Sequence, residues 1–185
     1  MVIPHHYLIF LVFFIVNYTS LAATNKPTQL VDTVCKQVSN YTFCVDSLSS
    51  DPRTRSADQE QLLFIAFQVA CSTALGTRDY IAEQLKNLNA PPPHNVTRDV
   101  RLSHLQKCSR DYDKAVSYLE VNNDNSNFDA ALQLADLAGE AARVADHCQA
   151  AFGRTASPTL TRRNRDLKLL CEICIAIADM FVVWV

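Results

Sequence analysis

Seven cysteines that follow an apolar N-terminal segment constrain this chain more than any other feature of its sequence. Residues 7–16 are apolar but too few to cross a bilayer, and small residues follow at 20–23. This order is typical of a secretory signal peptide, so we predict that residues 1–23 are removed and that residues 24–185 form one mature domain. Because secreted chains keep disulfides, we expect the cysteines to act first as cross-links and only then as metal ligands.

The composition argues against several classes of function. The formal net charge is −2, and residues 1–23 carry none of it, so the mature chain has no basic excess with which to bind nucleic acid. Three glycines in 185 residues leave few candidates for phosphate-binding loops or strained catalytic turns. We therefore expect a helical protein that needs no cofactor.

The hydrophobic pattern predicts an all-α fold. Apolar residues recur every three or four positions in long segments at about 57–89, 98–121 and 127–152, and in a last segment that starts at Ser157 and Pro158. Two short helical pieces, 28–38 and 41–50, precede them. We predict an up-and-down four-helix bundle with an N-terminal helical hairpin. The first long helix should direct residues 62, 66, 69, 73, 77, 81, 85 and 88 inward. The second should carry 105, 108, 112, 115 and 119 on one stripe, and the third should direct 128, 131, 135, 138, 142, 145 and 152 inward.

Local signals set the expected boundaries of the helices. Asp51, Pro52 and Arg53 should interrupt the chain after the hairpin, because a residue that precedes proline avoids the helical region. Ser56 and Gln59 have the spacing of a capping box that would open the first long helix. Prolines at 91–93 should end that helix, and the polar residues 122–127 should form a turn.

No catalytic or metal-binding pattern is present in the mature sequence. His94, His104 and His147 lie outside any recognised catalytic motif. Cys171 and Cys174 form a C-x-x-C within an apolar helical segment, where redox chemistry is not expected, so we interpret them as small buried side chains. Cys71 should also face the bundle interior, either free or bridged to one of these two cysteines. We expect no enzymatic activity.

The C-terminal segment is apolar but is not expected to be a membrane anchor. Glu172 and Asp179 interrupt it, and only six residues follow Asp179. We predict a buried last helix. Two N-x-T sequons, at Asn40 and Asn95, are candidate glycosylation sites in predicted loops or helix ends.

A series of residues along the mature chain resembles the plant invertase and pectin methylesterase inhibitor family. The series comprises Cys35 and Cys44, Asp51-Pro52-Arg53, Ala57-Asp58, Cys108 with Tyr112 and Ala115, Asp146 and Cys148 with Phe152, Ser157-Pro158, and Arg162-Arg163-Asn164. Within the family, the arginines at the start of the last helix and Cys171 are most similar to inhibitors of cell-wall and vacuolar fructosidase. The resemblance implies a secreted inhibitor with Cys35–Cys44 and Cys108–Cys148 disulfides, whose bundle docks over the substrate cleft of a cell-wall or vacuolar enzyme.

The implied pairing of Cys108 with Cys148 sets a geometric condition. In a hairpin symmetric about the turn at 122–127, Cys108 would face a residue near 141. The difference of seven helical residues is about 10 Å, too far for a disulfide. The pairing would therefore need a kink or an irregular stretch near the turn.

The family resemblance also suggests where a target enzyme would bind. Many invertase inhibitors carry Pro-Lys-Phe before the fourth long helix, and the corresponding residues here are Ser126, Asn127 and Phe128. Only Phe128 matches. Our first hypothesis is a 1:1 complex that blocks the cleft of an acid invertase in the apoplast or the vacuole. Pectin methylesterase is the alternative target, and a non-inhibitory carrier or storage-type bundle is a more distant alternative. Neither nucleic acid nor membrane is an expected partner.

Overall fold

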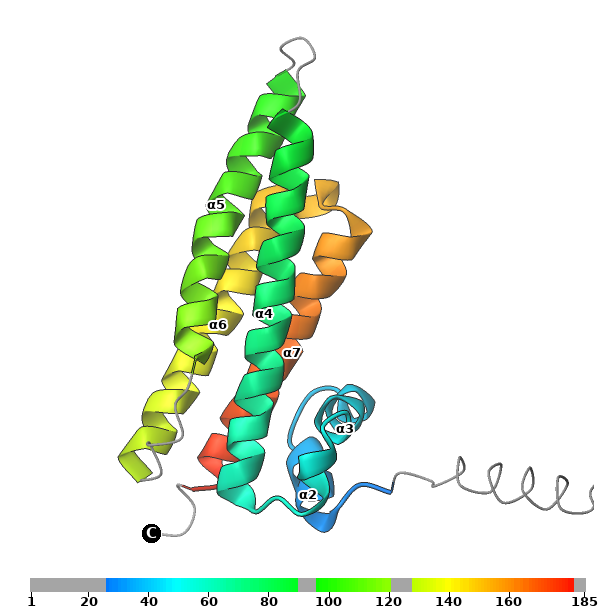
Figure 1. Ribbon diagram of the computed structural model, residues 1–185, viewed down its shortest axis with the longest axis vertical. Coiled ribbons are helices and arrows are strands. Elements are labelled where there is room, and N and C mark those ends of the chain that lie inside the picture. Colours follow the sequence, from blue (N-terminus) through cyan, green and yellow to red (C-terminus); the bar gives the residue numbers. More distant parts are fainter. Residues whose placement is uncertain (1–25, 90–95, 121–127, 182–185) are drawn as a thin grey trace, which may run out of the picture.

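The computed structural model describes residues 26–89, 96–120 and 128–181, and all regular structure within these ranges is helical. Four long helices lie side by side in up-and-down order, and two short helices form a hairpin against one end of the bundle (Figure 1). The elements are α2 (Gln29–Cys35), α3 (Tyr41–Ser49), η1 (Pro52–Arg55), α4 (Gln59–Asn89), α5 (Val96–Leu119), α6 (Phe128–Phe152), η2 (Gly153–Thr155) and α7 (Pro158–Asp179). The predicted all-α bundle with a disulfide-stapled hairpin is confirmed. None of the described helices combines the length and apolar character that a membrane span requires.

Helix starts follow the local chemistry, with one correction. Ser157 caps α7 by accepting a hydrogen bond from the Leu160 N–H at 3.2 Å, and Pro158 occupies the first turn as predicted. The capping box of α4 lies two residues later than predicted. The Asp58 carboxylate accepts from the Gln61 N–H at 2.8 Å, and the Gln61 side chain accepts from the Asp58 N–H at 3.1 Å.

Ser56 cannot serve as that cap because it belongs to the preceding turn. Residues Pro52–Arg55 form a 3-10 helix, and the Ser56 N–H closes it by donating to the Arg53 carbonyl oxygen at 3.2 Å. The predicted interruption after the hairpin is therefore a short ordered helix, and α4 begins after it.

The predicted buried stripes agree with the structure best in α5. In α5 all five predicted positions are buried: Leu105, Cys108, Tyr112, Ala115 and Leu119. In α4 residues 69 and 73 are only partly buried, whereas Ala70 and Ala74 are buried. In α6 residues 135 and 142 are likewise half-buried, whereas Leu134 and Ala141 are buried. A straight helix drifts by about 20° per heptad against a strict seven-residue repeat, so a stripe at fixed spacing includes some partly buried positions.

A disulfide fixes the register of α5 against α6. Cys108 and Cys148 are bonded with a Cα–Cα distance of 5.1 Å. Both helices remain helical throughout, and they are offset rather than symmetric about the turn. Because antiparallel helices advance in step, Leu119 lies about level with Leu137. Residues 128–136 of α6 therefore continue past the end of α5 (Figure 1).

A buried polar chain links three helices through the core. The Tyr112 hydroxyl donates to Asn164 Oδ1 at 2.7 Å, and Asn164 Nδ2 donates to Gln149 Oε1 at 3.2 Å. Tyr112 and Asn164 are buried, and burial raises the pKa of the tyrosine. Since buried polar groups are costly without partners, this chain specifies how α5, α6 and α7 fit together.

The hairpin is held on the bundle by a carboxylate clasp and a small apolar patch. The Ser39 N–H and hydroxyl donate to the two oxygens of Glu172 at 2.6 and 2.7 Å. The hairpin side chains of Val31, Val34 and Leu48 are buried in the same apolar core as the bundle. Within the hairpin, the Cys35–Cys44 disulfide joins α2 to α3 with a Cα–Cα distance of 5.5 Å.

Candidate inhibitory surface

The three free cysteines do not form a reactive centre. Cys171 and Cys174 are buried in the middle of α7, and burial raises the pKa of Cys171 to about 12 and that of Cys174 well above its ordinary value. Their thiols remain protonated and unreactive at neutral and acidic pH. Within the described ranges, His, Cys, Asp and Glu do not gather in groups of three or more that could hold a metal ion.

Cys71 differs from the expectation that it faces the interior. It is partly exposed and lines an open groove of about 610 Å³ beside the hairpin. Burial and the nearby Glu120 carboxylate raise the pKa of its thiol. Because Glu120, just after α5, lies near Cys71, the end of α5 is about level with Cys71 on α4.

One end of the bundle extends beyond α5. There the start of α4, residues 128–136 of α6 and the end of α7 continue past Leu119 and Glu120 (Figure 1). We call this three-helix part the projecting end. Its α6 segment begins directly after residues 121–127 in the sequence, and the predicted target-binding residues are Ser126, Asn127 and Phe128.

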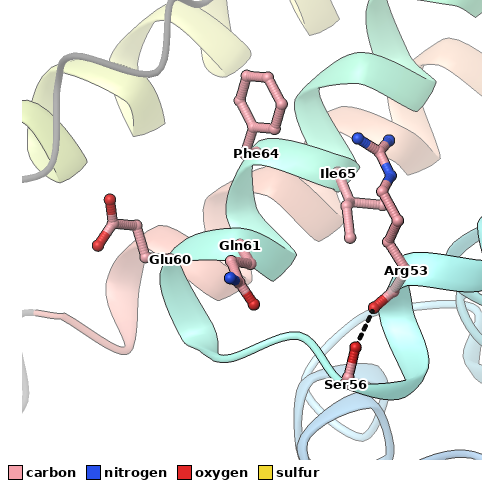
Figure 2. Close-up of a pocket in the computed structure, with 6 residues that line it drawn as sticks. All are labelled: Arg53, Ser56, Glu60, Gln61, Phe64 and Ile65. Atoms are coloured by element: carbon pink, nitrogen blue, oxygen red, sulfur yellow. Dashed lines mark hydrogen bonds between the residues drawn. The ribbon is translucent and has the colours of Figure 1, made fainter.

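A pocket of about 450 Å³ lies where the projecting end meets η1 (Figure 2). Its lining comprises Arg53, Ser56, Glu60, Gln61, Phe64 and Ile65. Figure 2 shows that Phe64 and Glu60 point away from the Arg53 side of the pocket. Phe64 is half-buried and Glu60 is exposed, so an aromatic ring and a carboxylate are both available to a partner.

Arg53 is the fixed cation of this region. Its Nε and backbone N–H both donate to Asp51 Oδ1 at 2.9 Å, and its guanidinium also donates to Gln68. The Arg53 guanidinium lowers the pKa of the Asp51 carboxyl. Asp51, Pro52 and Arg53 thus form a rigid corner that positions one wall of the pocket.

The projecting end is acidic. Glu60, Glu120, Asp136 and Asp179 are exposed, and no ion pair joins any of them to a cation among the described residues. At neutral pH these four carboxylates give this end negative charge, beside the cations Arg53 and Arg55 of η1.

The structure describes only part of the predicted target-binding site. Ser126 and Asn127 lie outside the described residues. Phe128 is the first residue of α6, and its side chain lies outside the described part. The turn itself thus stays a prediction, although α6 places Phe128 at the tip of the projecting end.

Of the two predicted glycosylation sites, only Asn40 lies among the described residues. Asn95 lies outside the described residues. Asn40 is exposed and caps α3, where its Oδ1 accepts from the Phe43 N–H at 3.1 Å. This cap does not use Nδ2, the atom to which a glycan is attached, so Asn40 can cap α3 and carry a glycan at once.

His104 and His147 lie away from the projecting end. His104 packs edge-on against Phe152 with ring centroids 5.3 Å apart, near the α6–α7 turn. His147 is exposed one residue before Cys148. Neither histidine adjoins the predicted target-binding turn.

Sequence reasoning missed the pocket residues Glu60 and Phe64. Phe64 lies outside the predicted inward stripe of the first long helix, which runs through 62 and 66. A large aromatic residue beside such a stripe was a usable signal, because an aromatic side chain outside the core is a common anchor of interfaces.

Comparisons with known proteins agree with this architecture. Residues 29–177 match the family described as "Plant invertase/pectin methylesterase inhibitor". The "Cell wall / vacuolar inhibitor of fructosidase 2" of Arabidopsis thaliana is 31% identical over 169 residues, which cover 89% of each chain.

Two solved structures share the fold. The mutant form A of a pectin methylesterase inhibitor from Arabidopsis superposes with a TM-score of 0.65 at 18% identity, covering 81% of this chain and 95% of that one. A pectin methylesterase inhibitor from Arabidopsis thaliana gives 0.58 at 17% identity, with coverage of 84% and 98%. The resemblance seen in the sequence is thereby confirmed: this chain belongs to the plant invertase/pectin methylesterase inhibitor family, whose members are inhibitors and not enzymes.

Proposed function

We propose that this protein is exported after removal of residues 1–23 and inhibits an acid invertase of the cell wall or vacuole as a 1:1 complex. The observation that carries the choice of target is the 31% identity, across 89% of both chains, to a relative named as an inhibitor of fructosidase. The projecting end and the 122–128 turn would occupy the sugar cleft, so that sucrose cannot reach the catalytic carboxylates.

The geometry suits an inhibitor because cross-links and hydrogen bonds hold the elements of the projecting end in place. Three helices form it, the Cys108–Cys148 disulfide fixes the register of α6, and Arg53 braces the adjacent pocket. Such preorganisation reduces the ordering cost of binding.

One observation favours pectin methylesterase as a second candidate. The projecting end carries Glu60, Glu120, Asp136 and Asp179, and the lysine of the invertase-inhibitor motif is replaced by Asn127. Two acidic surfaces repel each other, which disfavours a cleft built on paired carboxylates. An enzyme that binds polyanionic pectin needs a more basic groove, and an acidic bundle end would complement it.

A parallel titration tests both proposals. The mature, oxidised protein would be added to a purified acid invertase with sucrose and to a purified pectin methylesterase with esterified pectin. We expect stoichiometric inhibition of the invertase. Inhibition of the esterase alone would replace the first target with the second. Failure to inhibit either enzyme would overturn both and leave the carrier hypothesis.

The Phe128→Ala variant separates a binding role from a packing role. If Phe128 enters the enzyme cleft, its truncation should weaken inhibition by at least about thirtyfold, which corresponds to about 2 kcal/mol, and leave Tm unchanged. If it closes the bundle end, Tm should fall and inhibition should decrease only in step with folding.

A further inference from the structure

A row of cations lies on the opposite side of the molecule from the projecting end, and the proposed function does not use it. Residues 147–165 contain four arginines and no acidic residue, although the chain as a whole has a net charge of −2. Arg154 lies in η2, and Arg162 and Arg165 follow in the first turns of α7. With Lys168 they form what we call the α7 cationic row.

The row follows the periodicity of the helix. Arg162, Arg165 and Lys168 are three residues apart and all exposed, so their Cα atoms advance by about 4.5 Å each along α7. Arg154 is exposed in the short turn that immediately precedes the helix. The side chains therefore cover a convex edge rather than the floor of a cavity.

The two cations nearest the α6–α7 turn are not neutralised. No ion pair to Arg154 or Arg162 is found among the described residues. Arg165 meets Asp166 at 3.1 Å, and Lys168 reaches Asp146 at 2.9 Å. Both of those pairs are exposed, so they can exchange partners at little cost.

The neighbouring Arg163 packs against the bundle and does not belong to the row. Its guanidinium carbon lies 5.2 Å from the centre of the Tyr80 ring, and its Nε is buried. The Tyr80 hydroxyl is 3.0 Å from Ser157 Oγ, which caps α7. This packing anchors the first turn of α7, so the exposed arginines project from a rigid base.

We propose that the α7 cationic row binds a linear polyuronate, meaning a polysaccharide with a free carboxylate on each sugar, such as de-esterified pectin. Guanidinium groups bind carboxylates through paired hydrogen bonds. A single exposed contact of this kind is weak, and a row of four gains affinity only when one chain carries many carboxylates at once. A convex row suits an extended polymer better than a small anion.

Binding at this edge leaves the projecting end free. The row starts at the α6–α7 turn, whereas the start of α6, which follows residues 121–127 in the sequence, lies at the other end of the bundle (Figure 1). A protein held on wall polyuronate through α7 could still present its projecting end to an enzyme. This edge would thus retain the inhibitor in the wall independently of its target.

The test compares two variants with equal charge changes. Arg154→Gln with Arg162→Gln removes two cations from the row. Lys36→Gln with Lys114→Gln removes two exposed cations from α2 and α5. Each mature, oxidised protein would be titrated with polygalacturonate and with fully methyl-esterified polygalacturonate at several salt concentrations.

We expect the wild-type protein to bind polygalacturonate at low salt, to lose affinity as salt rises, and not to bind the ester. The arginine variant should bind at least about tenfold more weakly, because two charge-assisted contacts are lost. The lysine variant should stay within about twofold of wild type. Equal weakening of both variants, equal binding of the ester, or no binding of polygalacturonate would overturn the proposal.

Inhibition of a purified invertase with sucrose provides an independent readout, since that assay contains no polyuronate. The arginine variant should inhibit as well as the wild type. If it binds polygalacturonate normally but loses inhibition, the row is an enzyme contact and the polyuronate proposal is wrong. If neither protein inhibits any enzyme while the polymer result holds, only the proposed function fails.

Discussion

The hairpin and the bundle each contain one disulfide, but the two cross-links act in different ways. Cys35–Cys44 spans nine positions and joins two helices that have few buried side chains of their own. Cys108–Cys148 spans forty positions inside a large core. The first compensates for a small core, whereas the second selects one register between helices that could slide. Similar covalent bonds thus stabilise one region and align the other.

The largest effect should come from removing the bundle disulfide. Replacing Cys108 and Cys148 by serine should lower the free energy of unfolding by about 4 kcal/mol, as expected for a loop of this length. Urea unfolding followed by circular dichroism would measure it. If the disulfide sets register, the variant should also lose inhibition under conditions where it is still folded. Full inhibition by the folded variant would show that α6 needs no covalent alignment.

Removing the hairpin disulfide should cost less and act locally. Replacing Cys35 and Cys44 by serine should destabilise by about 2–3 kcal/mol. Because the hairpin contacts only part of the bundle, amide exchange should accelerate in α2 and α3 and stay slow in α5 and α6. Uniform acceleration along the chain would show that hairpin and bundle unfold as a single unit.

A smaller effect should follow from interrupting the polar chain in the bundle core. Tyr112→Phe removes the hydroxyl and leaves Asn164 Oδ1 without its 2.7 Å partner. We expect a loss of about 1–3 kcal/mol in the free energy of unfolding. Tyr118→Phe, at a half-buried position of the same helix, is the control and should change stability little. Equal losses of stability in the two variants would indicate that the hydrogen bond from Tyr112 to Asn164 does not stabilise the fold.

The clasp between hairpin and bundle should have a still smaller effect. Glu172→Gln keeps the size of the side chain and removes the charge that the Ser39 N–H and hydroxyl share. We expect the hairpin to be weakened by about 1 kcal/mol, seen as faster proteolysis within residues 26–55. The melting of the bundle should be unchanged. A drop in the Tm of the bundle would contradict a purely local clasp.

The smallest effect concerns Asp51 and depends on pH. The Arg53 guanidinium lowers the pKa of this carboxyl below its ordinary 3.8 in the folded state. Its stabilisation is therefore present above about pH 4 and is lost as pH falls through the lower, folded-state pKa. Asp51→Asn should be less stable than wild type at pH 6 by under about 1 kcal/mol, and the difference should vanish near pH 2. A difference that grows on acidification would have the wrong sign.

The sequence was sufficient for the fold because each long helix carried its own signals. Ser157 and Pro158 marked the start of α7, and the stripe from Leu105 to Leu119 marked the buried face of α5. The predicted capping box was two residues too early because two overlapping segments fit the pattern, Ser56 with Gln59 and Asp58 with Gln61. Only the 3-10 turn at Pro52–Arg55, which uses Ser56, decides between them.

The candidate site was less predictable because it depends on the offset between helices. No local pattern states that Leu119 lies level with Leu137, and that offset determines which part of α4 and α6 projects. The pocket beside Phe64 likewise requires η1 to be placed against α4. These are long-range relations, which periodicity within one helix cannot supply.

The position of α7 has a consequence for how the chain matures. During synthesis, Cys108 and Cys148 leave the ribosome before Cys171 and Cys174 do, so the first two can meet before the thiols of α7 are accessible. When α7 then packs, its two thiols are buried, where an oxidant or another disulfide cannot reach them. Refolding from the fully reduced chain presents all seven thiols at once. We therefore expect oxidative refolding to yield mispaired forms that vectorial synthesis avoids.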